Sequence, residues 1–255
     1  METIMKGVVS RNLPQANPDN VVAGTQARYG RYGEQYSLGL YNDMYALADE
    51  GGYFVATNPT ISTGIAFGGA AITSFTDTTG AGLALMNMDK ATSPAYKRIY
   101  LDYIKLIMAT IPTGTLAAPF MQFAIRIDNV LSRYTSGGSV ISQVNPNADV
   151  TQRASVAQLI FGALTLAALS SGGITVARGN VRGIAPVVGD QYVFNAGSVE
   201  KAVGAQSMAL ATAAQVLVNI PPIILGPQQV LSVHHWCGGQ TAAPVYEFEM
   251  GWWER

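Results

Sequence analysis

The C-terminal stretch from Pro222 to Arg255 restricts the fold more than any other part of the chain, because it alternates as a β-strand does. Over Val245–Trp253, large apolar residues occupy every second position: Tyr246, Phe248, Met250 and Trp252. The positions between them hold Val245, Glu247, Glu249 and Gly251. This period of two predicts a strand with an aromatic row on one sheet face and the glutamates on the other. A preceding strand is predicted over Gln229–Cys237, closed by Gly238 and Gly239.

Strands are also predicted along the rest of the chain, which indicates an all-β protein. The clearest are Tyr53–Ala56, a pair within Thr60–Thr76, Leu83–Met88, Pro119–Leu131, Ile174–Arg178, Gln191–Phe194 and Ile223–Leu225. Ala95–Ile111 fits both a helical stripe and an extended strand, and its β-branched and aromatic content favours the strand. Val156–Leu169 is predicted to be a buried element. Strands spaced by about ten residues, with turn signals between them, indicate a two-sheet sandwich or a barrel.

The first residues differ in composition from the remainder. Residues 1–30 contain Pro14, Pro18 and several Asn and Gln residues but few large apolar ones, so they are predicted to form an extended arm. Residues 31–255 show no linker and no internal repeat, and we expect a single domain. Within it, Asp43–Glu50 is a candidate helical turn, and Ser198–Gln215 fits a short helix or a strand equally well. Tyr134–Arg153 is predicted to be a long polar loop that reaches a neighbour or a partner.

The chain is poor in charge. Charged residues make up 12% of the 255 residues, about half the usual share of roughly 25%. No Asp, Glu, Lys or Arg occurs between Glu50 and Asp77, between Arg153 and Arg178, or between Lys201 and Glu247. Because a monomer needs charge to stay apart from its copies, these stretches predict surfaces covered by other subunits. The alternative is a monomer with a Thr, Ser and Gln surface.

Several partners and compartments are disfavoured by the same residues. The net charge is −1 with no basic stripe, which argues against nucleic acid and against anionic membranes. Val156–Leu169 is too short for a membrane-spanning helix, which needs about 20 apolar residues. The N-terminus shows no signal peptide. Cys237 has no second cysteine in the chain to pair with and is expected to be a small buried hydrophobe.

No arrangement of residues in the sequence specifies catalysis. His234 and His235 are adjacent, so on a strand they point to opposite faces and cannot bind one metal ion together. Ser232 shares a face with His234, which is more typical of strand neighbours than of a catalytic dyad. Carboxylate pairs could be chosen from Asp102, Asp128, Glu247 and Glu249, as in most proteins. We therefore predict a protein that is not an enzyme and has no catalytic, cofactor-binding or metal-binding residues.

Four stretches together carry a resemblance. They are Asp49–Thr60, Arg126–Val130, Gly189–Phe194 and the segment from Gly226-Pro227 to the terminal Tyr246–Arg255. The set resembles structural proteins of tailed bacteriophages, over most of the chain after residue 48. The resemblance implies a jelly-roll-like antiparallel β-sandwich that decorates or cements the head. It also implies a homo-oligomer, such as a trimer, on the major capsid protein or another virion protein, and a location in the virion.

Three other functions stay open at the sequence level. A tail or neck component would have the same composition with a different ring symmetry. A receptor- or carbohydrate-binding virion module would expose aromatic residues, with Trp252 and Trp253 as the candidates, in a shallow groove. A jelly-roll enzyme would need a cleft in which His and carboxylate side chains converge.

Overall fold

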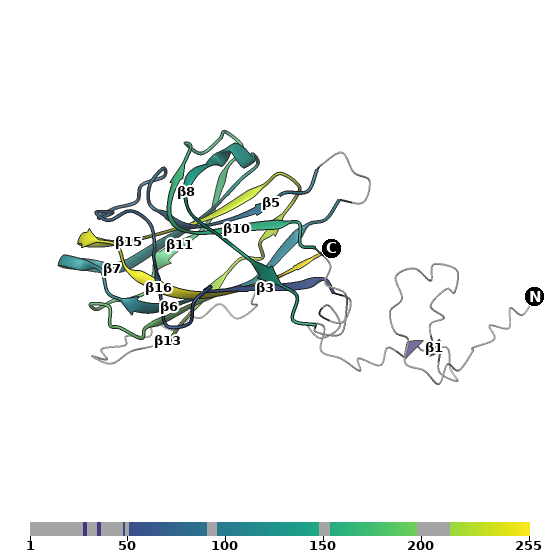
Figure 1. Ribbon diagram of the computed structural model, residues 1–255, viewed down its shortest axis with the longest axis horizontal. Helices are drawn as coiled ribbons and strands as arrows, with labels where there is room; N and C mark the ends of the chain where they lie inside the picture. The colour runs from purple at the N-terminus through teal and green to yellow at the C-terminus, as the bar shows by residue number, and fades with distance from the viewer. Residues whose placement is uncertain are drawn as a thin grey trace, which may run out of the picture.

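The computed structural model is a sandwich of two β-sheets (Figure 1). It describes residues 51–90, 96–147, 154–197 and 215–255, together with Ala48 and a short pair of strands, β1 (Arg28–Tyr29) and β2 (Gln35–Tyr36). The predicted all-β fold and antiparallel sandwich are confirmed. Most of the arm predicted over residues 1–30, most of the helical turn predicted over Asp43–Glu50, and nearly all of Ser198–Gln215 lie outside the described residues.

The first sheet has six strands in the order β11-β7-β15-β5-β10-β8. Their bounds are β5 (Ala81–Asn87), β7 (Thr113–Asp128), β8 (Tyr134–Ile141), β10 (Ala157–Leu166), β11 (Ile174–Asn180) and β15 (Val230–Ala242). A single 3-10 turn, η1 (Leu131–Arg133), joins β7 to β8. All neighbouring pairs in this sheet are antiparallel.

The second sheet has the order β13-β12-β6-β16-β3-β9, with β14 also paired to β6 and β4 to β16. Its strands are β3 (Tyr53–Thr57), β4 (Ile65–Ala66), β6 (Ile99–Thr110), β9 (Gln143–Val144), β12 (Gln191–Ala196), β13 (Gln215–Ile220), β14 (Ile224–Leu225) and β16 (Val245–Glu254). Only β12 and β13 run parallel. For Ala95–Ile111 the sequence fitted both a helix and a strand and favoured the strand. The structure confirms the strand, because β6 lies within this segment.

Eight of these strands pair in a nested order. Taken along the chain they are β3, β5, β6, β7, β11, β12, β15 and β16. The first pairs with the last (β3 with β16), and the second with the seventh (β5 with β15). The third pairs with the sixth (β6 with β12), and the fourth with the fifth (β7 with β11). This is the pairing expected when one long antiparallel ribbon is rolled up on itself.

One ribbon continues from sheet to sheet. Strand β6 leads into β7 through Ile111-Pro112, and β15 leads into β16 through Ala243-Pro244. β7 pairs with β15 up to Thr113↔Ala242, and β6 pairs with β16 from Thr110↔Val245. Because proline cannot donate a ladder hydrogen bond, a proline in each of the two connections fits the place where the ribbon bends. We call this bend the ribbon corner, and it lies at the left of Figure 1.

The core lies between the two sheets and follows from the alternation in the sequence. Tyr246, Phe248, Met250 and Trp252 all point inward and are at most 3% exposed. The predicted aromatic row of β16 is therefore confirmed. It meets inward rows of the other sheet, for example where Phe248 stacks on Phe161 with ring centroids 4.1 Å apart. Burial of large apolar side chains like these is the main stabilising contribution in such a sandwich.

Two predicted segments are wrong. Thr60–Thr76 is not a pair of strands, because only Ile65–Ala66 is in a strand and the rest of the segment is turns and loops over one end of the sandwich. Tyr134–Arg153 is not a loop throughout, because β8 and β9 lie within it. Gly137 and Gly138 both have positive φ values and lie at an irregularity where β8 pairs with β10. Glycine in a strand interior can mark such a bulge.

Candidate functional site

The two adjacent histidines lie on opposite faces of β15, as predicted. His235 points into the core, where its ring contacts Phe67, Tyr192 and Tyr246 at centroid distances of 5.5–6.2 Å. Burial lowers its pKa to about 3, so the ring is neutral. Cys237, two residues later on the same face, is also buried, and burial raises the pKa of its thiol. Both side chains are therefore part of the core, and the prediction that Cys237 is a small buried residue is confirmed.

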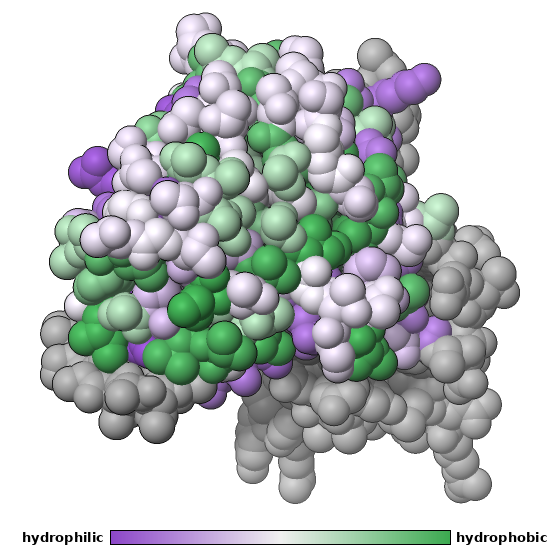
Figure 2. All heavy atoms as spheres, turned by 60° about the vertical axis from the view of Figure 1, so that its left-hand side comes forward, coloured by the Kyte–Doolittle hydropathy of each residue, from purple (hydrophilic) through white to green (hydrophobic). Residues whose placement is uncertain are grey.

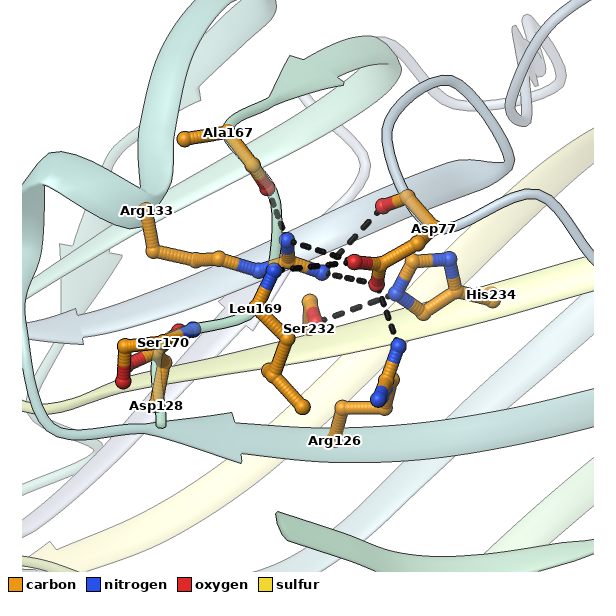
Figure 3. A network of polar contacts seen from close by, with 9 residues as sticks. All are labelled: Asp77, Arg126, Asp128, Arg133, Ala167, Leu169, Ser170, Ser232 and His234. Carbon is orange, nitrogen blue, oxygen red and sulfur yellow. Dashed lines mark hydrogen bonds and ion pairs between the residues drawn. The ribbon is translucent and has the colours of Figure 1, made fainter. Parts of the chain in front are cut away.

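The opposite face of β15 carries the main polar network of the six-stranded sheet (Figure 3). At its centre is Asp77, in the loop before β5. Its carboxylate accepts hydrogen bonds from Arg133 (2.5 Å from Nη2 to Oδ1, and 3.2 Å from Nη1 to Oδ2) and from Arg126 (2.5 Å from Nη1). The Leu169 N–H donates to Oδ2 at 2.9 Å. One carboxylate thus ties the loop to β7, η1 and the segment after β10.

This arrangement sets the charge of the network. Burial alone would raise the pKa of Asp77, but the hydrogen bonds from Arg133 and Leu169 and the positive charges of Arg133 and Arg126 outweigh it and lower the pKa. Arg133 is 1% exposed, so its charge depends on Asp77 for compensation. A second carboxylate, Asp128, has a pKa that burial raises but that hydrogen bonds from Ser170 bring below its usual value.

His234 lies beside this network and is fully buried. Its Nε2 is hydrogen-bonded to Ser232 Oγ at 3.1 Å, and the ring of Phe75 lies over it at a centroid distance of 5.3 Å. Burial, followed by the charge of Arg133, lowers the pKa of His234 to about 4. Ser232 and His234 do form the pair that their spacing allows, but both are covered and at most 1% exposed. A substrate carbonyl cannot reach this hydroxyl, so the pair does not serve as a nucleophile and base.

Beside Phe75 the same sheet face is hollowed into a groove of about 490 Å³. It is lined by Phe75, Gln122, Phe123, Ala124, Arg126, Thr175, Arg178, Gly179, Asn180 and Trp236. Phe75 and Trp236 contact edge to face at 5.6 Å between centroids, and the Arg126 guanidinium lies 5.3 Å from the centre of the Phe75 ring. We call this hollow the Trp236 groove.

The four carboxylates that the sequence offered as pairs do not form one cluster, although Asp102 and Glu249 both lie near Tyr53 and Tyr103. Asp128 lies on the six-stranded sheet, whereas Asp102, Glu247 and Glu249 lie on the eight-stranded sheet. There, Asp102 accepts a hydrogen bond from Tyr53 at 2.8 Å, and burial raises the pKa of Asp102.

Glu249 accepts a hydrogen bond from Tyr103 and lies 3.8 Å from Lys105 Nζ. Neighbouring side chains thus occupy both Asp102 and Glu249, and neither carboxylate lines the Trp236 groove.

The two tryptophans proposed as exposed aromatic residues of a binding module, Trp252 and Trp253, differ in exposure. Trp252 is 0% exposed in the core, so the interpretation of Trp252 as a surface aromatic is wrong. Trp253 is partly exposed, but its ring is stacked on Tyr100 at 5.7 Å and nearly parallel to it. The tryptophan in a groove is instead Trp236, which the sequence analysis did not single out.

A signal for this site was present in the sequence. Asp77 and Arg178 are the charges that end two of the long neutral stretches. Isolated charges next to neutral strands have few sequence neighbours to pair with, so they find distant partners or line a site. The sequence could not show that Asp77 meets Arg133 or that Arg178 reaches the same face as Trp236, because both depend on sheet order.

No group of three or more His, Cys, Asp or Glu side chains in the described ranges is placed to hold a metal ion. None of the helices in those ranges is long and apolar enough to cross a membrane. Comparison with protein-family models, with curated proteins and with solved structures found no match.

Proposed function

We propose that the sandwich is a jelly roll and that the protein is a structural component of a tailed-bacteriophage virion, in which copies associate with one another and with a capsid protein. The observation that carries the proposal is the nested pairing of eight strands, first with last through fourth with fifth. Jelly rolls have eight strands in two sheets and are common in viral capsids. The resemblance of the sequence to phage structural proteins supports the same function.

The surface supports self-association. Figure 2 views the molecule towards the ribbon corner, and this face is mostly white and green, with purple hydrophilic residues mainly near its margins. The first part of β7, Thr113–Ala118, is largely exposed and has no charged residue. Ile61, earlier in the chain, is 89% exposed. Uncharged, partly apolar surface of this kind is suited to contact with another subunit.

The interface can have ordinary dimensions. Stable protein–protein interfaces bury about 800 Å² on each partner, a small part of the 14814 Å² of accessible surface that this chain presents. The absence of charge on the first part of β7 removes the desolvation penalty that buried ions carry. Removal of apolar area from water, at about 25 cal/mol per Å², then supplies the adhesion.

The first experiment measures the assembly directly. Native mass spectrometry and sedimentation velocity of the purified full chain should show a closed homo-oligomer, with a trimer as the expected form. Ala117→Glu places a charge on the exposed part of β7 and should shift the distribution towards monomer. Ser136→Glu, exposed on β8, is the matched control and should not. A wild-type protein that stays monomeric at high concentration contradicts the proposal.

The second experiment tests the location. Electron microscopy of virions labelled with an antibody to this protein should place it on the head. Deletion of residues 1–30 should leave a folded domain that attaches poorly, because the arm is proposed to order on contact with the neighbour. Label on the tail or neck would replace the head assignment, and unchanged attachment of the truncated protein would refute the role of the arm.

A further inference from the structure

We infer that the Trp236 groove binds a saccharide that carries a carboxylate group. The inference does not depend on the virion proposal, because it rests on the side chains of one sheet face. The volume of the Trp236 groove, about 490 Å³, lies within the range of about 300–1,000 Å³ usual for small-molecule sites.

The groove is a regular product of the sheet register. Strands β11, β7 and β15 lie side by side, and their outward residues form three rows across the sheet. The rows are Asn180–Gln122–Trp236, Arg178–Ala124–His234 and Thr175–Arg126–Ser232. Ala124 lies at the centre of these rows and has a small side chain, so it forms the bottom of the hollow. The larger side chains around it form the sides. A hollow fixed by strand pairing is already formed before a ligand binds, which reduces the loss of entropy on binding.

The charges around the groove favour an anion. Two guanidinium groups, Arg126 and Arg178, line the groove, and none of its lining residues is an Asp or Glu. Asp77 holds Arg126 and Arg133, with nitrogen–oxygen distances of 2.5 Å in both ion pairs. Arg178 is exposed and takes part in none of the ion pairs found among the described residues. Its fork of N–H donors is therefore available for a carboxylate.

The remaining walls suit a sugar ring. Trp236 and Phe75, which is 40% exposed, meet at a T-shaped angle and present aromatic surface to one side of the groove. The C–H face of a pyranose packs against such surface, since the face of an aromatic ring is negative. On the other side, Asn180 and Thr175 are exposed and can exchange hydrogen bonds with hydroxyl groups. Aromatic, amide, hydroxyl and guanidinium groups thus converge on one hollow.

Calorimetric titration of the full chain tests this with four probes: 3′-sialyllactose, digalacturonic acid, neutral lactose and inorganic sulfate. At least one acidic saccharide should bind with a Kd of about 1 mM or tighter, and at least about tenfold more tightly than lactose. Failure of both acidic saccharides to bind in this range overturns the inference. Equal binding of lactose overturns the role of the carboxylate. Sulfate binding as strong as that of the best saccharide reduces the groove to an anion site and overturns the assignment to a sugar.

Two variants connect binding to the groove. Arg178→Gln should weaken the acidic saccharide by about tenfold or more, while any weak binding of lactose stays unchanged. Trp236→Leu should weaken both. Arg98→Gln, an exposed cation beside Tyr96 on another part of the surface, is the control and should bind as the wild type does. Thermal melts confirm that each variant is folded, and folded groove variants with unchanged affinity overturn the site.

Discussion

Mild acid should unfold this protein, because two fully buried histidines must stay neutral in the folded state. Folding lowers the pKa of His234 from 6.5 to about 4 and that of His235 from 6.5 to about 3. Below pH 6.5 the unfolded chain therefore binds protons that the folded protein does not. The free energy of unfolding is therefore highest above pH 6.5, and it decreases as the pH falls from 6.5 towards the pKa values of the folded state.

The magnitude follows from the shifts. One pKa unit corresponds to about 1.4 kcal/mol, so between pH 6.5 and pH 4 the two histidines together remove about 6 kcal/mol of unfolding free energy. That is comparable with the whole stability of a typical domain, about 5–15 kcal/mol. The lowered pKa values of Asp77 and Asp128 act at still lower pH, and the raised pKa of Asp102 acts in the opposite direction. The interval above about pH 5 therefore reports mainly the histidines.

Urea denaturation followed by tryptophan fluorescence, at several values between about pH 6 and pH 5, gives the slope. We expect about 2.4 kcal/mol per pH unit over this interval, which approaches the limit of about 2.7 kcal/mol for two protons taken up on unfolding. His234→Gln removes one titrating group and should halve the slope. A wild-type stability that does not change over this interval, or a slope that the variant leaves unaltered, would refute the reasoning.

Three further predictions concern stability, and each is measured by urea denaturation. Asp77→Asn should cost about 3–5 kcal/mol, since it leaves Arg133, 1% exposed, without its counter-charge. Gly239→Ala should cost about 2 kcal/mol or more, because φ is +74° and the new Cβ would lie 1.9 Å from a carbonyl oxygen of β7. Gly183→Ala, with nothing within 4 Å, is the control and should change stability by less than about 0.5 kcal/mol. Trp252→Ala should cost about 3–5 kcal/mol because the indole is fully buried.

The sequence was informative where one face of a strand is buried and the other is not. The alternation in β16 predicted both the strand and the gathering of Trp252's row on one sheet face, because a period of two leaves one solution when half of the positions are large and apolar. The prediction failed over Thr60–Thr76, where small Gly, Ala and Thr residues fit a strand or a loop equally well. It failed again over Tyr134–Ile141, an exposed edge strand without an apolar row.

The candidate site was less accessible to prediction, because it depends on which strands are neighbours. The opposite orientation of His234 and His235 follows from local geometry and was predicted. The meeting of Asp77 with Arg133 joins residues 56 positions apart through a loop and a 3-10 turn. Arg178 and Trp236 face one groove only because β11 and β15 flank β7. Local patterns in a sequence do not specify such long-range order.

The ribbon that bends between the sheets has a consequence for synthesis of the protein. β15 and β16 follow all their sheet neighbours in the sequence and are interior strands of their sheets, β15 between β7 and β5 and β16 between β6 and β3. Until they emerge, the earlier strands lack the neighbours that hold them together, so neither half of the sandwich can close during translation. Folding is therefore expected to begin only after β16 has been synthesised, and removal of Val245–Glu254 would take away the middle of a sheet.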